Sequence, residues 1–304
     1  MGHGHHHEEE LPAGVAAASE LPNPRAAADW DRMVLPEGVK QRLLNWAVLA
    51  LKHGDLLPYG DSALQRLLLL AGPPGTGKST TARGLANAAI SEIDPGAGGL
   101  LIELDPHALP SDMLGQSQRN VAKLMHHTIP GLARAGQRVV VVIDEVDAFA
   151  VSRSAASFET NPADLHRATD AVLAGLDLVA RQFPSVLFVA TTNFPQAVDD
   201  AVISRADWTV KFEYPDLPAS TMILREALGR LATRWPSIER YAGDAEVLEH
   251  LAKLCDGLDG RAVAKLGTLA LTWRTEVAHD PAQLTFEDLT SAAHQLCHDR
   301  GNSL

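Results

Sequence analysis

The sequence predicts an α/β protein in which a parallel sheet with flanking helices is followed by a small all-α lid domain. Between residues 67 and 212, short apolar runs alternate with segments of helical periodicity. The runs are Leu67–Ala71, Leu100–Leu104, Val139–Ile143, Val186–Ala190 and Val210–Phe212. This alternation is typical of parallel strands joined by helices that cover both faces of the sheet. After residue 218 the patterns are helical, so we expect the second domain to consist of helices.

Composition divides the chain into three expected segments. Residues 1–29 combine a His- and Glu-rich start with an Ala/Pro-rich stretch, which predicts a disordered, solvated tail. Residues 30–216 form the large α/β domain, whose first helix is expected at Glu37–Leu51. Tyr214–Pro218 breaks the chain, and residues 217–304 form the helical lid domain. Its expected helices are Ala219–Thr233, Asp244–Cys255, Gly260–Ala278 and Phe286–Asp299.

The bulk composition limits the classes of function. The chain has 304 residues, of which 26 are basic and 38 acidic, giving a formal net charge of −12. A protein that grips nucleic acid usually presents a basic face, so we expect no direct nucleic-acid partner. The cysteines, Cys255 and Cys297, provide neither a disulfide framework nor a thiolate zinc cluster. Because we find neither an apolar run of membrane-spanning length nor a signal peptide, we expect a cytoplasmic protein with no membrane partner.

The stretch Gly72–Ser79 reads GPPGTGKS and fits the phosphate-binding pattern G-x-x-x-x-G-K-[ST]. It lies between an expected strand and an expected helix, which is the setting that a phosphate-binding loop requires. The alternative is a Gly/Pro-rich turn with a chance lysine, which this setting disfavours. Glycines at 75 and 77 let backbone N–H groups approach phosphate oxygens. We therefore predict that ATP is bound by Pro74, Gly75, Thr76, Gly77, Lys78, Ser79 and Thr80, with Lys78 at the β- and γ-phosphates.

A pair of acidic residues follows the β-branched run Val139–Ile143. Ligands of open α/β sheets bind at the carboxyl ends of strands, so Asp144 and Glu145 are expected at the nucleotide site. Asp144 would hold Mg²⁺ together with the Ser79 hydroxyl. Glu145 would orient and deprotonate the water that attacks the γ-phosphate. The alternative is a helix N-terminus decorated with acids, which the preceding phosphate loop disfavours.

Asn193, Arg205 and Arg261 complete the predicted site. Asn193 ends the next strand and is interpreted as a sensor that hydrogen-bonds the attacking water or a γ-phosphate oxygen. Arg205 lies beyond that strand, and Arg261 begins a helix of the lid domain. An arginine at the γ-phosphate neutralises charge in the transition state, and one supplied by a neighbouring subunit makes hydrolysis depend on assembly. For Arg205, a surface ion pair with Asp207 is an equal alternative.

This ordered set of motifs resembles the AAA+ ATPases over about residues 30–296. Finer features resemble the pachytene-checkpoint/thyroid-receptor-interacting remodellers, in their bacterial, HORMA-associated anti-phage-defence branch. Those features are Trp30-Asp31, Val39-Lys40, the phosphate loop itself, Asp164–Asp177, Ser204–Asp207 and Gly257–Arg261. The resemblance implies the same roles for Lys78, Asp144, Glu145 and Asn193, with Arg205 as the finger that acts on a neighbouring subunit and Arg261 as the lid sensor.

The resemblance also implies an ATP- and Mg²⁺-dependent enzyme that works as a homo-hexamer. Members of the family partly unfold HORMA-domain proteins, and bacterial members dismantle a complex of a HORMA protein with a cyclic-oligonucleotide synthase. The expected function is therefore ATP-driven remodelling that restrains anti-phage signalling. The tail before Trp30 is too short for the folded N-terminal domain that recruits substrate in eukaryotic members.

Ser111–Gly115 follows the second expected strand, where family members present an aromatic-hydrophobic pair to the threaded polypeptide. Met113 and Leu114 occupy that place, and methionine is flexible enough to grip varied side chains. Packing of both residues in the core is the alternative.

Three other functions compete with the remodeller. The first is a loader-type AAA+ ATPase that acts on DNA-bound protein assemblies, which the acidic balance disfavours. The second is a nucleotide-dependent scaffold without hydrolysis, which the presence of Glu145, Asn193 and Arg205 disfavours. The third is a metalloprotease, which would need a His-Glu-x-x-His motif that the sequence lacks.

Overall fold

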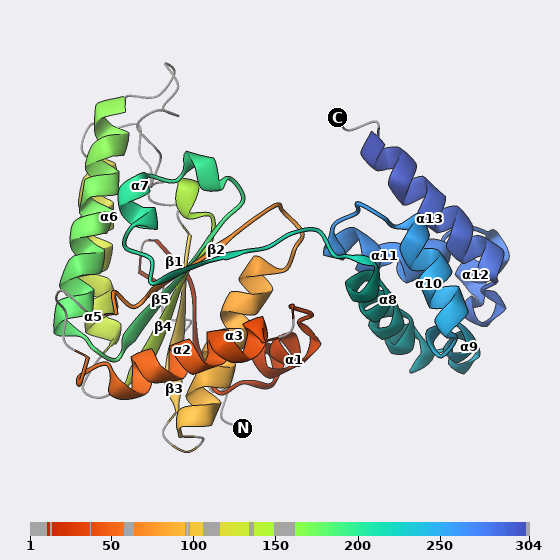
Figure 1. Ribbon diagram of the computed structural model, residues 1–304, viewed down its shortest axis with the longest axis horizontal. Helices are drawn as coiled ribbons and strands as arrows, with labels where there is room; N and C mark the ends of the chain where they lie inside the picture. The colour runs from red at the N-terminus through yellow and green to blue at the C-terminus, as the bar shows by residue number, and fades with distance from the viewer. Residues whose placement is uncertain are drawn as a thin grey trace, which may run out of the picture. The chain divides into compact units, whose positions relative to one another are not determined.

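The computed structural model describes residues 11–12, 14–36, 38–57, 64–94, 96, 98–105, 116–133, 137–148 and 162–301 (Figure 1). The chain groups into two units. The first comprises residues 1–31, 40–71 and 79–211, and the second comprises residues 32–39, 72–78 and 212–304. The phosphate loop is thus grouped with the helical end of the chain. The expected domain boundary between residues 216 and 217 stays a prediction.

The first unit is built on a 6-stranded sheet with the order β1-β3-β4-β5-β2-β6. The strands are β1 (Val15–Leu21), β2 (Leu67–Ala71), β3 (Gly99–Leu104), β4 (Arg138–Ile143), β5 (Val186–Thr192) and β6 (Trp208–Lys211). Neighbouring strands run parallel, except that β1 pairs antiparallel with β3. The predicted α/β class with a parallel sheet is confirmed, and the predicted strands shift only at their ends.

The central strands are apolar because both faces of the sheet are covered. β2 is buried along its whole length, and β4 is buried from Val139 onward. Figure 1 shows α3 (Lys78–Ile93) on one side of the sheet, with α5 (Ile129–Leu132) and α6 (Pro162–Gln182) on the other. Strands enclosed in this way lose the alternation of polar and apolar residues that a half-exposed strand shows. Because β2, β4 and β5 are parallel neighbours, their carboxyl ends lie at one edge of the sheet.

Shorter elements connect the strands. They are α1 (Pro24–Arg32), α2 (Val39–His53), α4 (Gln116–Lys123), the π-helix Leu124–Thr128, the 3-10 turns Val146–Ala148 and Pro195–Ala197, and α7 (Asp200–Ile203). The expected helix at Glu37–Leu51 corresponds to α2. A buried arginine, Arg66, lies just before β2, where its guanidinium donates to the backbone carbonyls of Gly54 and Ala180.

The expectation of a disordered tail over residues 1–29 is wrong for residues 15–21, which form β1, and for residues 24–29, which lie in α1. The Ala-rich composition suggested that this segment has too little apolar surface to fold. Backbone pairing to β3, from Leu21↔Gly99 to Val15↔Leu104, supplies the stabilisation instead. The two ends of β1 are also buried, with Val15 8% and Leu21 3% exposed. Residues 1–10 and 13 lie outside the described residues.

The chain after residue 212 is helical, as predicted. Its helices are α8 (Leu217–Ala232), α9 (Glu239–Ala242), α10 (Ala245–Leu254), α11 (Gly260–Ala270), α12 (Thr275–His279) and α13 (Phe286–Gly301). Asp216, Asp244 and Asp259 cap α8, α10 and α11 by accepting backbone N–H groups of the first turn. The single helix expected over Gly260–Ala278 is two helices, because Arg274 is extended and its guanidinium binds Asp288 in α13.

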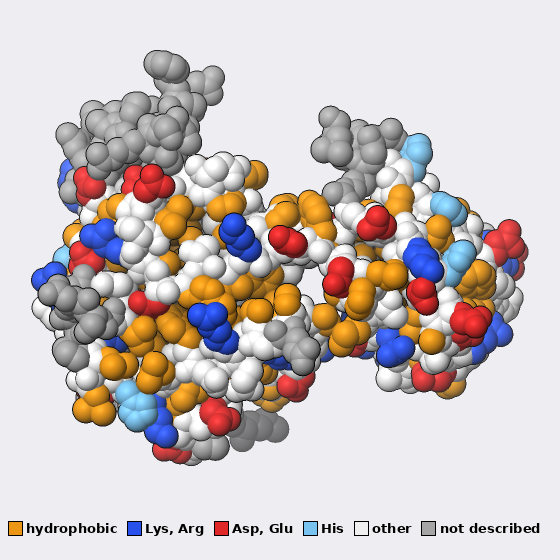
Figure 2. Space-filling view, viewed as in Figure 1, with side chains coloured by type: hydrophobic (Ala, Val, Ile, Leu, Met, Phe, Trp, Pro, Cys, Tyr) orange, Lys and Arg blue, Asp and Glu red, His pale blue; other side chains and the backbone are white. Residues whose placement is uncertain are grey.

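Among the helices in the described part of the chain, none is long and apolar enough to cross a membrane. On the face in Figure 2, acidic and basic side chains are interspersed across the surface. The exposed large apolar side chains include Phe194, which is 55% exposed and follows Asn193 in the sequence.

The ion pair between Arg274 and Asp288 predicts how acid affects the helical part. Hydrogen bonds from Arg274, with further bonds from Thr285, lower the pKa of Asp288 to about 2. Since the unfolded value is about 3.9, Asp288 stabilises the folded state above about pH 4, and this contribution is lost as the pH falls toward 2. We expect Asp288→Asn to lower the free energy of unfolding at pH 7, and the difference from wild type to narrow between pH 4 and pH 2.

Urea unfolding at several pH values measures this difference, and Asp256→Asn, at an exposed position, is the matched control. If the difference in the free energy of unfolding between wild type and Asp288→Asn stays constant down to pH 2, the ionised carboxylate of Asp288 is not the stabilising species.

Candidate active site

The phosphate loop Gly72–Lys78 joins β2 to α3 and requires glycine at two positions. Gly75 and Gly77 have φ values of 78° and 94°, in the left-handed region that favours glycine. Gly75 has a further constraint, because a Cβ at this position would lie 2.3 Å from Oδ1 of Asp259. Larger residues at these positions would therefore change the path of the backbone that is predicted to surround the phosphates. Pro74 and Thr76 lie in the same turn.

Lys78 begins α3 and is held within the loop. Its side-chain Nζ donates to the carbonyl oxygens of Gly72 and Pro73, at 2.8 Å each, and the residue is 5% exposed. The Thr76 hydroxyl also donates to the Pro73 carbonyl, at 2.8 Å. The loop thus folds around the ammonium group, which becomes a fixed positive charge beside the backbone that would surround a phosphate. Ser79 and Thr80 follow in the first turn of α3.

The start of α11 contacts the phosphate loop within the second unit. Asp259 caps α11, and its Oδ1 accepts the backbone N–H groups of Arg261 and Ala262, both at 2.9 Å. The Arg261 N–H also donates to the Gly75 carbonyl at 3.2 Å, while the Arg261 side chain is exposed. The predicted lid sensor is therefore attached to the loop through its backbone. We did not predict Asp259 as part of the site, although an Asp-Gly pair before a helix indicates a capping residue.

The acidic pair, Ser79 and Asn193 meet in the first unit. Asp144 and Glu145 follow β4, and Asn193 follows β5, the adjacent parallel strand. The Ser79 hydroxyl donates to Oδ1 of Asp144 at 2.6 Å. Nδ2 of Asn193 donates to Oε1 of Glu145 at 2.9 Å. Hydroxyl and carboxylate oxygens are ligands that Mg²⁺ prefers, so Ser79 and Asp144 fit a magnesium ion.

Thr191, at the end of β5, links both acidic residues. Its hydroxyl donates to Oδ1 of Asp144 and accepts the backbone N–H of Glu145 at 3.1 Å. The residue is 1% exposed. The sequence indicated polar residues at the end of this strand, but strand alternation alone does not reveal which of Thr191 and Thr192 points toward Asp144.

Arg205 is held by an acidic partner that the sequence did not indicate. Its Nε and Nη2 donate to the two carboxylate oxygens of Asp177 on α6, at 3.0 and 3.1 Å, and Nη1 donates to the Ala201 carbonyl at 3.1 Å.

Asp207, which was the alternative partner of Arg205, instead accepts the backbone N–H groups of Gln65 and Arg66, at 2.7 and 2.8 Å. Burial raises the pKa of Asp207, against the opposing effect of these hydrogen bonds.

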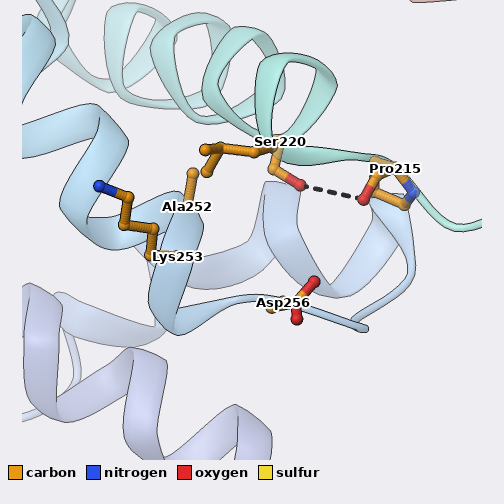
Figure 3. Close-up of a pocket in the computed structure, with 6 residues that line it drawn as sticks. Pro215, Ser220, Ala252, Lys253 and Asp256 are labelled. Atoms are coloured by element: carbon orange, nitrogen blue, oxygen red, sulfur yellow. Dashed lines mark hydrogen bonds between the residues drawn. The ribbon is translucent and has the colours of Figure 1, made fainter.

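Met113 and Leu114, the predicted substrate-gripping pair, lie outside the described residues. A separate pocket of about 290 Å³ lies between α8 and α10 (Figure 3). Its lining includes Pro215, Ser220 and Asp256, and the Ser220 hydroxyl points to the Pro215 carbonyl at 3.5 Å. The predicted site residues are not part of this lining.

Comparison with known proteins identifies the family to which this site belongs. Residues 68–214, which include the acidic pair and Arg205, match the family described as "ATPase family associated with various cellular activities (AAA)". CD-NTase-associated protein 6 of Pseudomonas aeruginosa is 41% identical to the chain over 285 residues, which cover 94% of this chain and 93% of that protein. The chain belongs to the AAA ATPase family.

Other relatives of this AAA ATPase are pachytene checkpoint proteins. The Arabidopsis thaliana homologue is 29% identical over 289 residues, covering 83% of the chain and 61% of the homologue. The Danio rerio homologue is 31% identical over 283 residues, covering 86% of the chain and 66% of the homologue. The AAA ATPase therefore spans nearly the whole of the Pseudomonas relative and about two thirds or less of these eukaryotic ones. The predicted ATPase class and the pachytene-checkpoint branch are confirmed.

Solved structures show the same fold for this AAA ATPase. The structure of C. elegans PCH-2 has a TM-score of 0.77 and 24% identity, and the match covers 97% of the chain and 77% of that protein. A chain in the E. coli MS115-1 HORMA:CdnC:Trip13 complex has a TM-score of 0.73 and 19% identity, with 92% and 95% covered. At these identities the likeness supports the fold, and the residue roles depend on this chain's own contacts.

Proposed function

We propose that this AAA ATPase uses ATP hydrolysis to remodel a HORMA-domain protein, and that it thereby restrains anti-phage signalling by a cyclic-oligonucleotide synthase. The observation that carries the ATPase half of the proposal is the contact set at the ends of β4 and β5, where Ser79 binds Asp144 and Asn193 binds Glu145. The partner half is supported by the 41% identical relative named CD-NTase-associated protein 6 and by the HORMA:CdnC:Trip13 complex with the same fold.

The proposed chemistry assigns one task to each residue of the cluster. Mg²⁺, held by Ser79 and Asp144, would neutralise charge on the phosphates. Glu145 accepts a proton from the attacking water, and Asn193 fixes the carboxylate by its hydrogen bond to Oε1, so that the base points in one direction. Lys78 contributes its positive charge to the β- and γ-phosphates. The remaining loop residues supply backbone N–H groups from Pro74 to Thr80.

The two arginines would connect hydrolysis to assembly and movement. We propose that the enzyme works as a homo-hexamer in the cytoplasm and that Arg205 reaches the γ-phosphate bound by a neighbouring subunit. Asp177 holds the Arg205 guanidinium through two hydrogen bonds, which restricts the side chain before it meets a phosphate. Arg261 would sense the nucleotide from the start of α11, whose backbone binds the phosphate loop at Gly75.

ATP turnover measured with different additions tests the proposed function. The purified protein is assayed alone, with a purified HORMA-domain protein, and with double-stranded DNA at physiological salt. We expect Mg²⁺-dependent turnover that the HORMA-domain protein stimulates and DNA leaves unchanged. Stimulation by DNA alone would support a loader-type ATPase instead.

Substrate gripping by Met113 and Leu114 gives a separate prediction. If these side chains contact the polypeptide, Met113→Ala with Leu114→Ala removes the contact and leaves the ATP site intact. We expect ATP turnover within about twofold of wild type, because the substitutions remove no group that binds the phosphates. Remodelling of the HORMA-domain protein, followed by its change in elution on gel filtration, should be lost. Unchanged remodelling by the double variant contradicts the assignment of this loop.

A further inference from the structure

Thr191 occupies a junction between the magnesium-binding and water-activating halves of the site. One hydroxyl group makes both contacts, because it donates its proton to Oδ1 of Asp144 and accepts the Glu145 N–H at 3.1 Å. Oδ1 of Asp144 is the same oxygen that accepts the Ser79 hydroxyl at 2.6 Å. Oδ1 of Asp144 therefore accepts hydrogen bonds from one hydroxyl on α3 and one on β5.

The backbone at Glu145 needs such support. Glu145 has a φ of 55°, in the left-handed region, which a residue with a Cβ adopts at an energetic cost. Such conformations persist where surrounding contacts hold them. The Thr191 hydroxyl accepts a hydrogen bond from the N–H of Glu145. The hydroxyl therefore stabilises the turn that directs the Glu145 side chain toward Asn193.

The strand itself does not require the hydroxyl. Thr191 is 1% exposed and its neighbours in β5 are Ala190 and Thr192, both buried. Valine has the same branched shape, prefers strands as strongly as threonine does, and has no polar atom to satisfy in a buried position. At this position threonine differs from valine in the hydroxyl group, which contacts Asp144 and Glu145.

We propose that Thr191 is a positioning residue of the ATPase site, which fixes the rotamer of Asp144 for magnesium binding and the backbone of Glu145 for water activation. The proposal rests on the function proposed above. The Thr191 hydroxyl and the Ser79 hydroxyl both donate to Oδ1 of Asp144, and together they restrict the orientation of the carboxylate. Without the Thr191 hydroxyl, Asp144 loses one of these partners and the Glu145 N–H loses this acceptor.

The pair Thr191→Val and Thr191→Ser separates the hydroxyl from the shape of the side chain. Valine keeps the shape and removes the hydroxyl, whereas serine keeps the hydroxyl and removes the methyl group. We expect Thr191→Val to lower kcat by about 10- to 100-fold, because a misplaced general base affects the chemical step, and to raise KM for ATP, because Asp144 is no longer held for magnesium binding. Thr191→Ser should stay within about threefold of wild type in both constants.

A binding measurement tests the magnesium side without turnover. A fluorescent ATP analogue is titrated into each variant in EDTA and again in Mg²⁺. Wild type and Thr191→Ser should gain affinity when Mg²⁺ is present, and Thr191→Val should lose most of that gain. Melting temperatures of the variants establish that they are folded, and Thr191→Ala replaces Thr191→Val in the comparison if the valine variant does not fold.

Equal losses in Thr191→Val and Thr191→Ser would overturn the proposal, because they would indicate that packing of the methyl group matters. A Thr191→Val protein with wild-type kcat and wild-type gain from Mg²⁺ would also overturn it. Glu145→Gln distinguishes this failure from failure of the proposed function. If Thr191→Val is active and Glu145→Gln is inactive, the ATPase assignment stands and only the role of Thr191 is wrong.

Discussion

Replacement of Glu145 with glutamine should stop ATP turnover and leave ATP binding intact. Glutamine keeps the shape of the side chain and a hydrogen-bonding oxygen for Asn193, but it cannot accept a proton from water. General bases contribute about 10²- to 10⁴-fold to rate, so we expect kcat to fall by that factor. The phosphate loop is unchanged in this variant, and the affinity for a fluorescent ATP analogue should remain within about threefold of wild type.

Asp147 provides the matched control for this experiment. It lies two residues after Glu145 in the same acidic stretch, and its position in the 3-10 turn Val146–Ala148 follows the site directly. Asp147→Asn changes a neighbouring carboxylate in the same way and should keep kcat within a few-fold. Near-normal turnover by Glu145→Gln, with a large loss in Asp147→Asn, would show that the base has been assigned to the wrong residue.

Replacement of Arg205 with alanine should also remove most activity, although no γ-phosphate contact within one subunit is assigned to it. An arginine at the γ-phosphate is worth about 10³- to 10⁵-fold in other nucleotide hydrolases, because its charge offsets the charge that develops in the transition state. We expect kcat to fall by at least 10²-fold, with ATP affinity little changed. Gel filtration of Arg205→Ala confirms whether assembly is preserved.

Mixing two inactive variants tests whether Arg205 acts on a neighbour. An Arg205→Ala subunit keeps Glu145, and an adjacent Glu145→Gln subunit can donate the arginine that it lacks. In a ring assembled from equal amounts of both, half of the sites have Glu145 and half of their neighbours supply Arg205, so about a quarter of the wild-type activity should return. Activity no greater than the sum of the separate variants would indicate that Arg205 acts within its own subunit or has no catalytic part.

The parts of the fold that depend on local pattern were predictable. The β2 and β4 segments are continuous apolar runs because both faces of the sheet are covered, and such runs stand out from the helical segments. The acidic pair could be placed near Asn193 because parallel neighbouring strands end at one edge of the sheet. The strand order brings these residues together, and this order does not follow from the alternating pattern alone.

Contacts that depend on tertiary pairing were not predictable from a single sequence. β1 consists mostly of alanine and serine and is stabilised by backbone pairing to β3, which a composition argument cannot detect. The Asp177 partner of Arg205 lies on α6, far away along the chain, so the nearby Asp207 seemed the natural candidate. The Thr191 hydroxyl bonds Asp144, and Asp259 caps α11. Both contacts depend on the path of the folded backbone.

The most direct test of the central claim is the dissociation of a HORMA-domain protein from its cyclic-oligonucleotide synthase, followed in real time by fluorescence energy transfer between labels on the two proteins. We predict that wild-type protein with ATP and Mg²⁺ releases the synthase, and that neither Glu145→Gln with ATP nor wild type with a non-hydrolysable ATP analogue does so. Release at the same rate in all three reactions, or no release by an active wild-type ATPase, would contradict the claim that ATP hydrolysis at this site drives remodelling.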